Sequence, residues 1–246
     1  MKRARVIYQG GEWTATEADG MACLPDGRRL AETEVTWLPP VIPRTIFAVG
    51  LNYADHAREL AFTPPTEPLI FLKSPNTIGG HRSTVRRPAD VTFMHYECEL
   101  AVVIGRAARR VGRAEALDYV AGYTVANDYA FRDYLENYYR PNLRVKGRDH
   151  ATPLGPWLVD PADVPDPANL VLRTTVNGHE TQRGSTSDMI FSVAWLIEYL
   201  SGFLTLSPGD LILTGTPDGL VNVQVGDVVT TEVQGVGRLT STIVGD

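Results

Sequence analysis

Short apolar runs recur along the chain, and most of them have the length of a β-strand rather than of a helix. Residues 45–50, 69–72 and 100–104 are examples, each rich in β-branched or aromatic side chains and bounded by polar residues, glycine or proline. Runs of this kind are typical of buried strands. Asn177-Gly178 separates two further strand-like segments and predicts a tight hairpin turn.

The clearest helical pattern covers residues 187–200. Ser187 stands at its start and can cap the free N–H groups of the first turn, and Gly202 follows its end. We also expect a short helix at 113–119 and a helical or irregular aromatic segment at 129–139. The apolar stripe of the main helix consists of Ile190, Val193, Ala194 and Ile197.

The first 43 residues have the pattern of short strands and turns that end in a proline-rich linker. Pro39, Pro40 and Pro43 restrict the backbone there. We therefore expect residues 1–43 to form a small β appendage and linker, and residues 44–246 to form the main domain. At 246 residues the chain is long enough for this arrangement.

Composition excludes several classes of protein. The net charge of −6 argues against a nucleic-acid-binding surface, which is normally basic. No apolar run reaches the ~18 residues that a membrane-spanning helix needs, and no apolar signal-peptide core follows the basic start of the chain. Cys23 and Cys98 are the only cysteines, so there is no disulfide framework. We therefore expect a cytoplasmic protein with no nucleic-acid or membrane partner.

Three carboxylates stand beside two of the strand-like runs. Glu97 and Glu99 precede and enter the run 100–104, and on one strand their side chains would share a face, roughly 7 Å apart along the chain. Asp128 ends the next strand-like run, 123–128. Three carboxylates that converge from two strands suit a hard cation such as Mg²⁺ or Mn²⁺. The alternative is a solvated strand edge, with Asp128 capping a helix.

Lysines are notable in this chain because arginine supplies nearly all of its positive charge. Only three of the 23 basic residues are lysines, and lysine offers a compact charge and a pKa that the environment can shift. Lys73 ends a strand-like run, and Lys146 lies among arginines in the segment 140–149. A group of cations near a carboxylate site indicates an anionic substrate. The alternatives are surface lysines and a solvated basic loop.

Two further segments contain candidate functional groups. His56 and Glu59 would face the same way on a short helix that Asn52 can cap, and Glu59 could orient the imidazole as a general base. The alternative is an exposed pair of little consequence. The turn 215–219 would expose N–H groups that could hold a carboxylate or an oxyanion, or it is a plain turn.

Taken in order, motifs between residues 44 and 244 resemble the fumarylacetoacetate hydrolase family. The resemblance implies an α+β fold, namely a mixed β-sandwich or roll with a few short helices, and a homodimer. The matching motifs are Gly50-Leu51-Asn52-Tyr53-Ala54-Asp55-His56, Phe71-Leu72-Lys73, His95-Tyr96-Glu97-Cys98-Glu99-Leu100, Asn127-Asp128, Lys146-Gly147-Arg148-Asp149, Val176-Asn177-Gly178, Met189-Ile190-Phe191 and Thr214-Gly215-Thr216-Pro217.

The same resemblance implies a role for most of the candidate residues, with Mg²⁺ or Mn²⁺ as the cofactor and a small anionic 2-oxo acid as the substrate. It places His56 and Glu59 on a lid over the substrate. The implied roles are metal ligation by Glu97, Glu99 and Asp128; catalysis by His56, Glu59 and Lys146; and substrate binding by Asn52, Lys73 and Thr216.

Within the family, the segments 94–97, 133–144 and 191–192 look like the branch that contains the decarboxylase/isomerase of homoprotocatechuate (4-hydroxyphenylacetate) breakdown. Better-known members of that branch are two fused copies of the catalytic unit, whereas this chain is one copy. The implied reaction is metal-dependent decarboxylation, isomerisation or both, of a 2-oxo or 2-hydroxy-diene polycarboxylate.

Substrate choice would depend on what holds the end of the molecule far from the metal. Arg140 and Arg144 precede Lys146, and arginine is suited to a bidentate grip on a carboxylate. We therefore expect a substrate with a distal carboxylate. The alternatives are an acylpyruvate-type C–C hydrolase, an oxaloacetate decarboxylase, and a non-catalytic metal-binding or structural protein.

Overall fold

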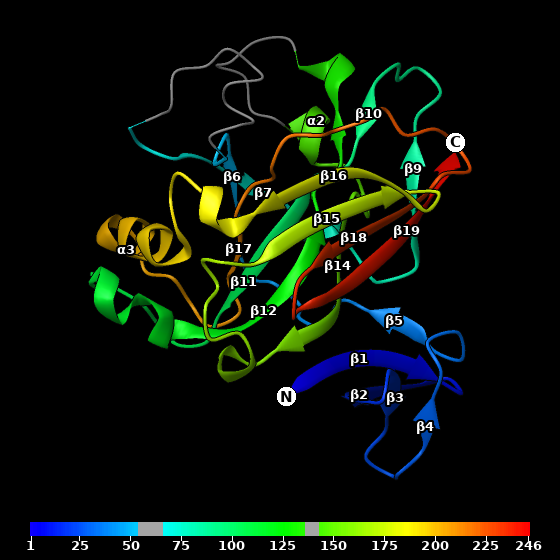
Figure 1. Cartoon of the computed structure of the whole chain (residues 1–246), viewed down its shortest axis with the longest axis horizontal. Helices are drawn as coiled ribbons and strands as arrows, with labels where there is room; N and C mark the ends of the chain where they lie inside the picture. The colour runs from blue at the N-terminus through cyan, green and yellow to red at the C-terminus, as the bar shows by residue number, and fades with distance from the viewer. Residues whose placement is uncertain (54–65, 136–142) are drawn as a thin grey trace.

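The computed structural model describes residues 1–53, 66–135 and 143–246, and Figure 1 shows how their elements are arranged. Strands dominate, which confirms the predicted α+β class with few helices. Within these ranges the α-helices are α2 Leu143–Lys146 and α3 Val193–Phe203, and short 3-10 turns lie at Pro75–Thr77, Arg113–Tyr119, Arg132–Tyr134, Pro161–Asp163 and Thr186–Asp188.

Twelve strands of the described chain form one large mixed sheet. Starting from the N-terminal strands, their spatial order is β4, β3, β2, β1, β14, β12, β11, β17, β6 and β7, while β5 pairs with β1 and β8 pairs with β14. Their bounds are β1 Lys2–Tyr8, β2 Gly11–Ala18, β3 Met21–Cys23, β4 Arg29–Leu30, β5 Thr36–Leu38, β6 Ile46–Gly50, β7 Leu69–Lys73, β8 Ile78–Gly79, β11 Cys98–Ile104, β12 Val120–Asn127, β14 Thr152–Val159 and β17 Leu211–Leu213.

A second sheet of five strands packs on the large one, and a small pair of strands lies beside it. The five-stranded order is β16, β15, β18, β19 and β9, in which β9 runs parallel to β19. The predicted hairpin at Asn177-Gly178 joins β15 to β16. The bounds are β9 Ser83–Arg87, β15 Val171–Val176, β16 His179–Ser185, β18 Val228–Val233 and β19 Gly237–Gly245, and the pair is β10 Met94–His95 with β13 Ala130–Phe131.

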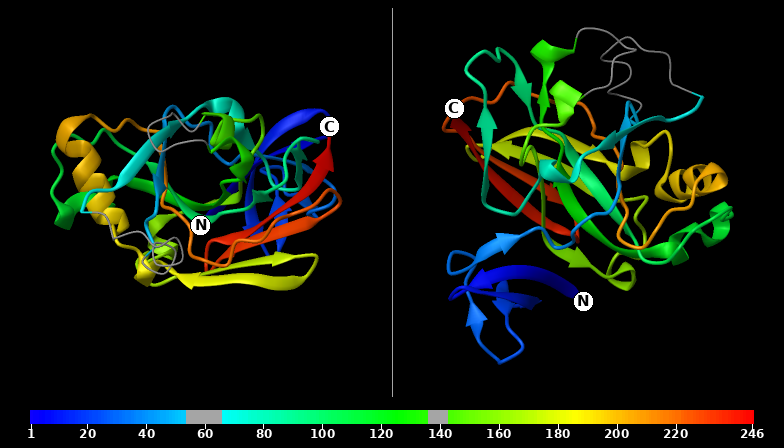
Figure 2. Two further views of the ribbon diagram at one scale, coloured as in Figure 1. Left: turned by 90° about the horizontal axis from the view of Figure 1, so that it is seen from above. Right: turned by 180° about the vertical axis from the view of Figure 1, so that it is seen from behind.

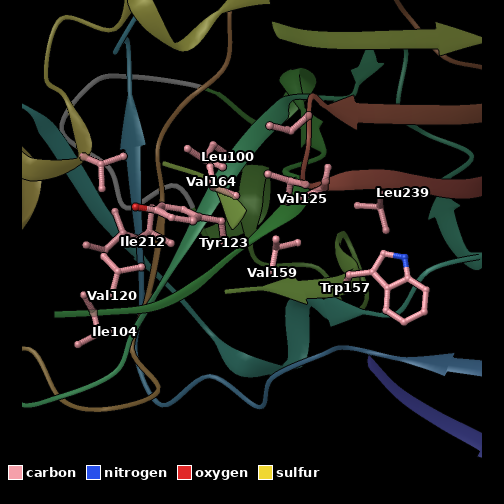
Figure 3. Packing of buried hydrophobic residues seen from close by; sticks show 14 of the residues in the cluster. Leu100, Ile104, Val120, Tyr123, Val125, Trp157, Val159, Val164, Ile212 and Leu239 are labelled. Atoms are coloured by element: carbon pink, nitrogen blue, oxygen red, sulfur yellow. The ribbon is translucent and has the colours of Figure 1, made fainter. Parts of the chain in front are cut away.

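Strand β11 is buried on both faces, and its residues alternate between two hydrophobic clusters. Leu100 and Val102 belong to the cluster between the sheets, which also contains Leu172 of β15. Figure 3 shows Leu100 in this cluster with Tyr123 and Leu239. Ala101 and Val103 point the other way, into a second cluster on the far face of the large sheet. This alternation follows from the two-residue period of a strand, and it places Glu99 on the same face as Ala101 and Val103.

Helix α3 begins later than the sequence pattern predicts. Its cap is Ser192, whose Oγ accepts a hydrogen bond of 3.3 Å from the N–H of Trp195, and not Ser187. The reason is long-range: the N–H groups of Ile190 and Phe191 donate to Asn52, at 2.7 and 2.8 Å. These contacts hold the backbone before Ser192 outside the helix, and the helix then continues through Gly202 to Phe203.

The segment 129–139 also differs from its prediction. In place of a helix, the structure has β13 followed by a 3-10 turn at Arg132–Tyr134, and residues 136–139 lie outside the described part. Pairing with β10 draws the backbone at 130–131 into a strand. The short helix expected at 113–119 is a 3-10 turn.

Residues 1–43 contribute β1 to β5, which lie at one end of the molecule in Figures 1 and 2. They extend the large sheet, because Lys2 and Arg3 of β1 pair with Val159 and Leu158 of β14. The division at residue 43 stays a prediction. Among the described residues, no helix has both the length and the apolar character that crossing a membrane requires.

One buried histidine joins this N-terminal segment to the second sheet. His81 Nδ1 accepts a hydrogen bond of 3.0 Å from the N–H of Thr240, and its Nε2 faces the carboxylate of Glu32. A nitrogen that accepts an N–H carries no proton, so the ring is neutral and Nε2 is the donor to Glu32. Burial lowers the pKa of His81 below 6.5, although Glu32 opposes the shift.

We expect His81 to make the stability of the fold depend on pH. Because its folded pKa lies below its unfolded value, its contribution is complete above about pH 6.5 and declines as the pH falls. His81→Gln should cost about 1 kcal/mol at pH 7.5, and the gap to wild type should shrink toward pH 5. Urea unfolding at several pH values measures this gap. The exposed His179 supplies the control variant His179→Gln, and a gap that stays constant with pH would contradict the neutral ring.

Candidate active site

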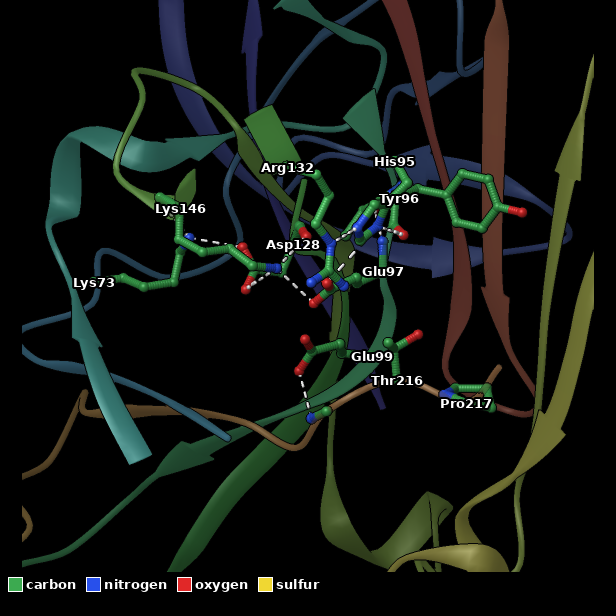
Figure 4. A network of polar contacts seen from close by, with 12 residues as sticks. Lys73, His95, Tyr96, Glu97, Glu99, Asp128, Arg132, Lys146, Thr216 and Pro217 are labelled. Atoms are coloured by element: carbon green, nitrogen blue, oxygen red, sulfur yellow. Dashed lines mark hydrogen bonds and ion pairs between the residues drawn. The ribbon is translucent and has the colours of Figure 1, made fainter. Parts of the chain in front are cut away.

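The pairing of β11 with β12 brings the three predicted carboxylates together. Cys98 pairs with Asn127, so Glu97, one residue earlier, lies opposite Asp128, whose N–H donates to the carbonyl of Glu97 at 2.9 Å. Opposite residues in an antiparallel pair share a face, and so do residues two apart. Glu97, Glu99 and Asp128 therefore point to the same side (Figure 4), each offering an oxygen within 4.8 Å of the others.

Glu99 shows that this cluster suits a cation. Its carboxylate is buried and accepts a hydrogen bond of 2.6 Å from the N–H of Gly215, yet no basic side chain of the described chain forms an ion pair with it. Burial, followed by the charges of Asp128 and Glu97, raises the pKa of Glu99 well above its usual range. A divalent cation with carboxylate ligands at about 2.0–2.6 Å would offset this cost. The donor set therefore fits Mg²⁺ or Mn²⁺.

Two buried lysines balance the other two carboxylates. Lys146 Nζ lies 2.6 Å from Glu97 Oε2 and 3.1 Å from Asp128 Oδ2, and it donates to the Asp128 carbonyl at 2.9 Å. Lys73 Nζ lies 2.6 Å from Asp128 Oδ1 and donates to the carbonyl of Lys146. The two exceptional lysines of the sequence thus meet at one site, at the ends of β7 and α2 (Figure 4).

The two lysines differ in their electrostatics. Desolvation lowers the pKa of Lys73, against the attraction of Asp128. Desolvation also disfavours the charged form of Lys146, but the charges of Asp128 and Glu97 outweigh it and raise the pKa of Lys146. Lys146 is therefore a proton-bearing cation beside the carboxylates. For Glu97 the desolvation cost is outweighed by nearby cations, chiefly Lys146 and also Arg132, and the pKa of Glu97 is lowered to about 2.

His95 and Arg132 also belong to the site, although the sequence analysis assigned no role to either. Arg132 Nε donates to His95 Nε2 at 2.6 Å, so this nitrogen carries no proton. The hydrogen of the neutral ring is then on Nδ1, which lies 3.0 Å from the Tyr96 carbonyl and 3.8 Å from Glu97 Oε1. Burial lowers the pKa of His95 to about 4, which agrees with the neutral ring. The sequence signals for His95 were its position two residues before Glu97 and its place at the start of a matching family motif, whereas Arg132 had none.

The loop after β17 is fixed beside Glu99 by contacts from several elements. Gly215 donates its N–H to Glu99, and the φ of Gly215 is 88°, a conformation that favours glycine. Asn52 donates to the carbonyls of Thr214 and Phe191 at 2.7 and 3.1 Å, and its Oδ1 accepts the N–H of Phe191. The side-chain amide of Asn52 is thus engaged in hydrogen bonds with main-chain groups. Thr216 is buried on this loop.

Of the remaining predicted residues, the structure describes only Arg144, which is not part of this cluster. The exposed Arg144 lies with its guanidinium carbon 4.0 Å from the centre of the Tyr134 ring. His56, Glu59 and Arg140 lie outside the described residues, so their roles stay predictions.

Comparison with known proteins agrees with this geometry. The chain is 58% identical over 246 residues to the 4-hydroxyphenylacetate degradation bifunctional isomerase/decarboxylase of Salmonella dublin, and the match covers 98% of this chain and 57% of that protein. The chain thus spans little more than half the length of this relative. The structure of 2-hydroxyhepta-2,4-diene-1,7-dioate isomerase from Mycobacterium marinum is similar over 100% of this chain and 99% of that one, with a TM-score of 0.87 and 36% identity.

A third relative is the crystal structure of fumarylpyruvate hydrolase from Pseudomonas aeruginosa in complex with Mn²⁺ and pyruvate. It is 32% identical, with a TM-score of 0.78 over 86% of this chain and 92% of that one. The family model described as fumarylacetoacetate (FAA) hydrolase C-terminal matches residues 45–244, which confirms the resemblance inferred from the ordered motifs. The chain belongs to the fumarylacetoacetate hydrolase family.

Proposed function

We propose that this chain is a divalent-metal-dependent enzyme that decarboxylates or isomerises a polycarboxylate in homoprotocatechuate catabolism. The substrates would be 5-oxopent-3-ene-1,2,5-tricarboxylate and 2-hydroxyhepta-2,4-diene-1,7-dioate. The observation that carries the proposal is the buried group of Glu97, Glu99 and Asp128 with Lys146 against it. The substrate class is supported by the 58% identity to the bifunctional relative.

Glu97, Glu99 and Asp128 would hold Mg²⁺ or Mn²⁺ in this proposal. The bound ion would supply Lewis-acid polarisation of a 2-oxo acid. The three carboxylates exceed the two ammonium groups by one charge, so the site accommodates a divalent cation together with an anionic substrate. Family membership supports dependence on a divalent metal in general, and the choice between Mg²⁺ and Mn²⁺ is part of the proposal.

Lys146 would stabilise the charge that develops during the reaction. Decarboxylation breaks the bond between the substrate carbon and its carboxylate, which departs as CO₂. The electron pair of that bond stays on the substrate as an enolate, and a nearby ammonium group lowers the energy of this anion. The raised pKa of Lys146 keeps its proton in place, so this residue acts as a cation rather than as a base. Proton transfer between carbons, which the isomerase reaction requires, is assigned to the predicted pair His56 and Glu59.

Two predicted substrate-binding residues are better placed to position other groups. Lys73 has Asp128 and the Lys146 carbonyl as partners, and Asn52 holds main-chain groups of the 214–216 loop. We therefore propose that both orient the residues that meet the substrate. Contact with a distal carboxylate by Arg140 and Arg144, and assembly as a homodimer, remain proposals from the sequence.

A second candidate function is hydrolysis of an acylpyruvate. It is favoured by the similarity to fumarylpyruvate hydrolase, whose structure contains Mn²⁺ and pyruvate. A metal-held 2-oxo acid end would serve both reactions, so the two functions differ in the group at the other end of the substrate.

The ratio of kcat/KM for the tricarboxylate to that for an acylpyruvate of similar length tests the proposal. With Mg²⁺ present we expect preference for the tricarboxylate, because cations that meet a distal carboxylate would be left unpaired by a methyl group. The expected cost of that replacement is about 2–5 kcal/mol. The same assay after chelation of the metal is the control. Preference for the acylpyruvate would favour the hydrolase.

A further inference from the structure

A chain of buried polar side chains runs from the second sheet to the loop that lies against the metal-binding cluster. Thr174 on β15 and Gln182 on β16 are cross-strand partners, and the Thr174 hydroxyl donates to Gln182 Oε1 at 2.9 Å. Gln182 Nε2 lies 2.9 Å from Thr216 Oγ1 and 2.8 Å from the Pro217 carbonyl. All three side chains are buried.

The Pro217 carbonyl fixes which way the amide of Gln182 points. A carbonyl oxygen only accepts hydrogen bonds, so the NH₂ group, and not Oε1, must face it. The same NH₂ group then donates its second hydrogen to Thr216 Oγ1. Both hydrogens of the amide thus donate hydrogen bonds, and its oxygen accepts one from the Thr174 hydroxyl. The side chain of Gln182 therefore has one hydrogen-bonded orientation.

This arrangement sets the role of the Thr216 hydroxyl. A hydroxyl that accepts a hydrogen bond from an NH₂ group turns its own hydrogen elsewhere. Within the described chain, no acceptor takes the hydrogen of Thr216. The preceding residue, Gly215, donates its N–H to Glu99 at 2.6 Å, and Figure 4 shows Thr216 beside Glu99. The free hydrogen thus belongs to a loop that contacts the cluster directly.

Close packing fixes the position of strand β16, which carries Gln182, against the 214–219 loop. An added Cβ at Gly184 would lie 2.5 Å from Pro217 Cβ, and one at Gly219 would lie 2.9 Å from the Thr181 carbonyl. Strand β16 therefore approaches the 214–219 loop as closely as glycine permits.

We infer that Gln182 is a positioning residue, which fixes the hydroxyl of Thr216 as a hydrogen-bond donor to an oxygen of the bound 2-oxo acid. The inference rests on the proposed function, because Thr216 is a substrate-binding residue only there. It assigns Gln182 no direct contact with the substrate. Its consequence is that a substitution at Gln182 weakens binding of the 2-oxo acid chiefly when Thr216 has a hydroxyl.

A double-mutant cycle on ligand binding tests this dependence without relying on turnover. The probe is pyruvate, titrated calorimetrically into protein loaded with Mn²⁺. Gln182→Met and Thr216→Val should each raise the Kd of pyruvate by about tenfold. The double variant should show about the same tenfold rise rather than a hundredfold one, because contacts that act through one group are not additive.

Thr174→Val supplies a milder variant if Gln182→Met does not fold. It removes only the outer hydrogen bond of the chain, so it should weaken pyruvate binding less, and not at all in the Thr216→Val background. Thr240→Val is the matched control. The hydroxyl groups of Thr240 and Thr230 are hydrogen-bonded in the same sheet, at 3.0 Å. Loss of this hydrogen bond should leave the Kd of pyruvate unchanged.

Three results would overturn the inference: additive effects of the two substitutions, unchanged pyruvate binding in Thr216→Val, and no pyruvate binding by the wild type. Failure of the proposed function gives a different pattern. In that case the wild type binds pyruvate with the expected coupling between Gln182 and Thr216, yet does not turn over the tricarboxylate, and the inference stands.

Discussion

Glu99→Gln is expected to abolish stabilisation of the protein by Mn²⁺ and to remove most of its turnover. Glutamine keeps the size of the side chain and an oxygen that accepts the Gly215 N–H, but it lacks the charge that a divalent cation requires. We expect metal affinity to fall by more than about 100-fold, because loss of groups that merely orient a ligand already costs 10–100-fold.

Thermal unfolding with and without Mn²⁺ measures this effect separately from catalysis. At a metal concentration near 100 times Kd, binding should stabilise the wild type by about 2.7 kcal/mol. For a chain of this size that raises Tm by about 5–10 °C. The variant should show no such rise. Its metal-free Tm should exceed that of the metal-free wild type, because an unpaired buried carboxylate has been removed.

The exposed pair of Glu198 and Arg113 supplies a matched control. Glu198→Gln makes the same chemical change. It removes the ion pair in which Glu198 lies 2.6 Å from Arg113, and Glu198 is far from the three carboxylates in the sequence. It should leave both the Mn²⁺ response and the turnover unchanged. Normal metal stabilisation in Glu99→Gln would refute the metal site.

The carboxylate cluster was predictable because it follows from local pattern and strand geometry. The apolar run 100–104 indicates a strand, and the two-residue period then places Glu97 and Glu99 on one face. Asp128 ends the next strand along the chain, and consecutive strands are often neighbours. The structure adds only the register, in which Cys98 pairs with Asn127.

Partners far apart in the sequence could not be predicted in this way. Lys73 is 55 residues from Asp128, and Gln182 is 34 residues from Thr216. The composition marked Lys73 as unusual, but no pattern states which carboxylate it meets. Gln182 stands in a polar segment that reads as an exposed strand, and its burial depends on the close approach of β16 to the 214–219 loop.

The predicted start of α3 was wrong for the same reason. The sequence pattern predicts Ser187 as the cap, whereas the structure uses Ser192, five residues later. The choice is made by Asn52, 139 residues before Phe191, because its hydrogen bonds to the N–H groups of Ile190 and Phe191 hold the backbone before Ser192 outside the helix. Tertiary contacts thus decide where a local signal takes effect.

Lys146→Met is expected to separate catalysis from metal binding. The lysine ammonium stands 2.6 Å from Glu97 and 3.1 Å from Asp128, where it repels any cation that these carboxylates hold. Its removal should therefore leave Mn²⁺ affinity equal to or greater than that of the wild type. Turnover should nevertheless fall by about 10²–10³-fold, because one stabilising donor of the developing anion is lost.

Lys146→Arg tests whether charge alone is sufficient at this position. The Nζ atom meets three oxygens between 2.6 and 3.1 Å in a buried site, and a planar guanidinium does not reproduce that arrangement. We therefore expect turnover to stay at least tenfold below wild type, whereas Lys2→Arg on the first strand should have no effect. A nearly normal Lys146→Arg enzyme would show that only positive potential is required. Loss of Mn²⁺ binding in Lys146→Met would instead assign Lys146 to holding the carboxylates in place, because an ammonium that acts only on the reacting anion has no reason to support the metal.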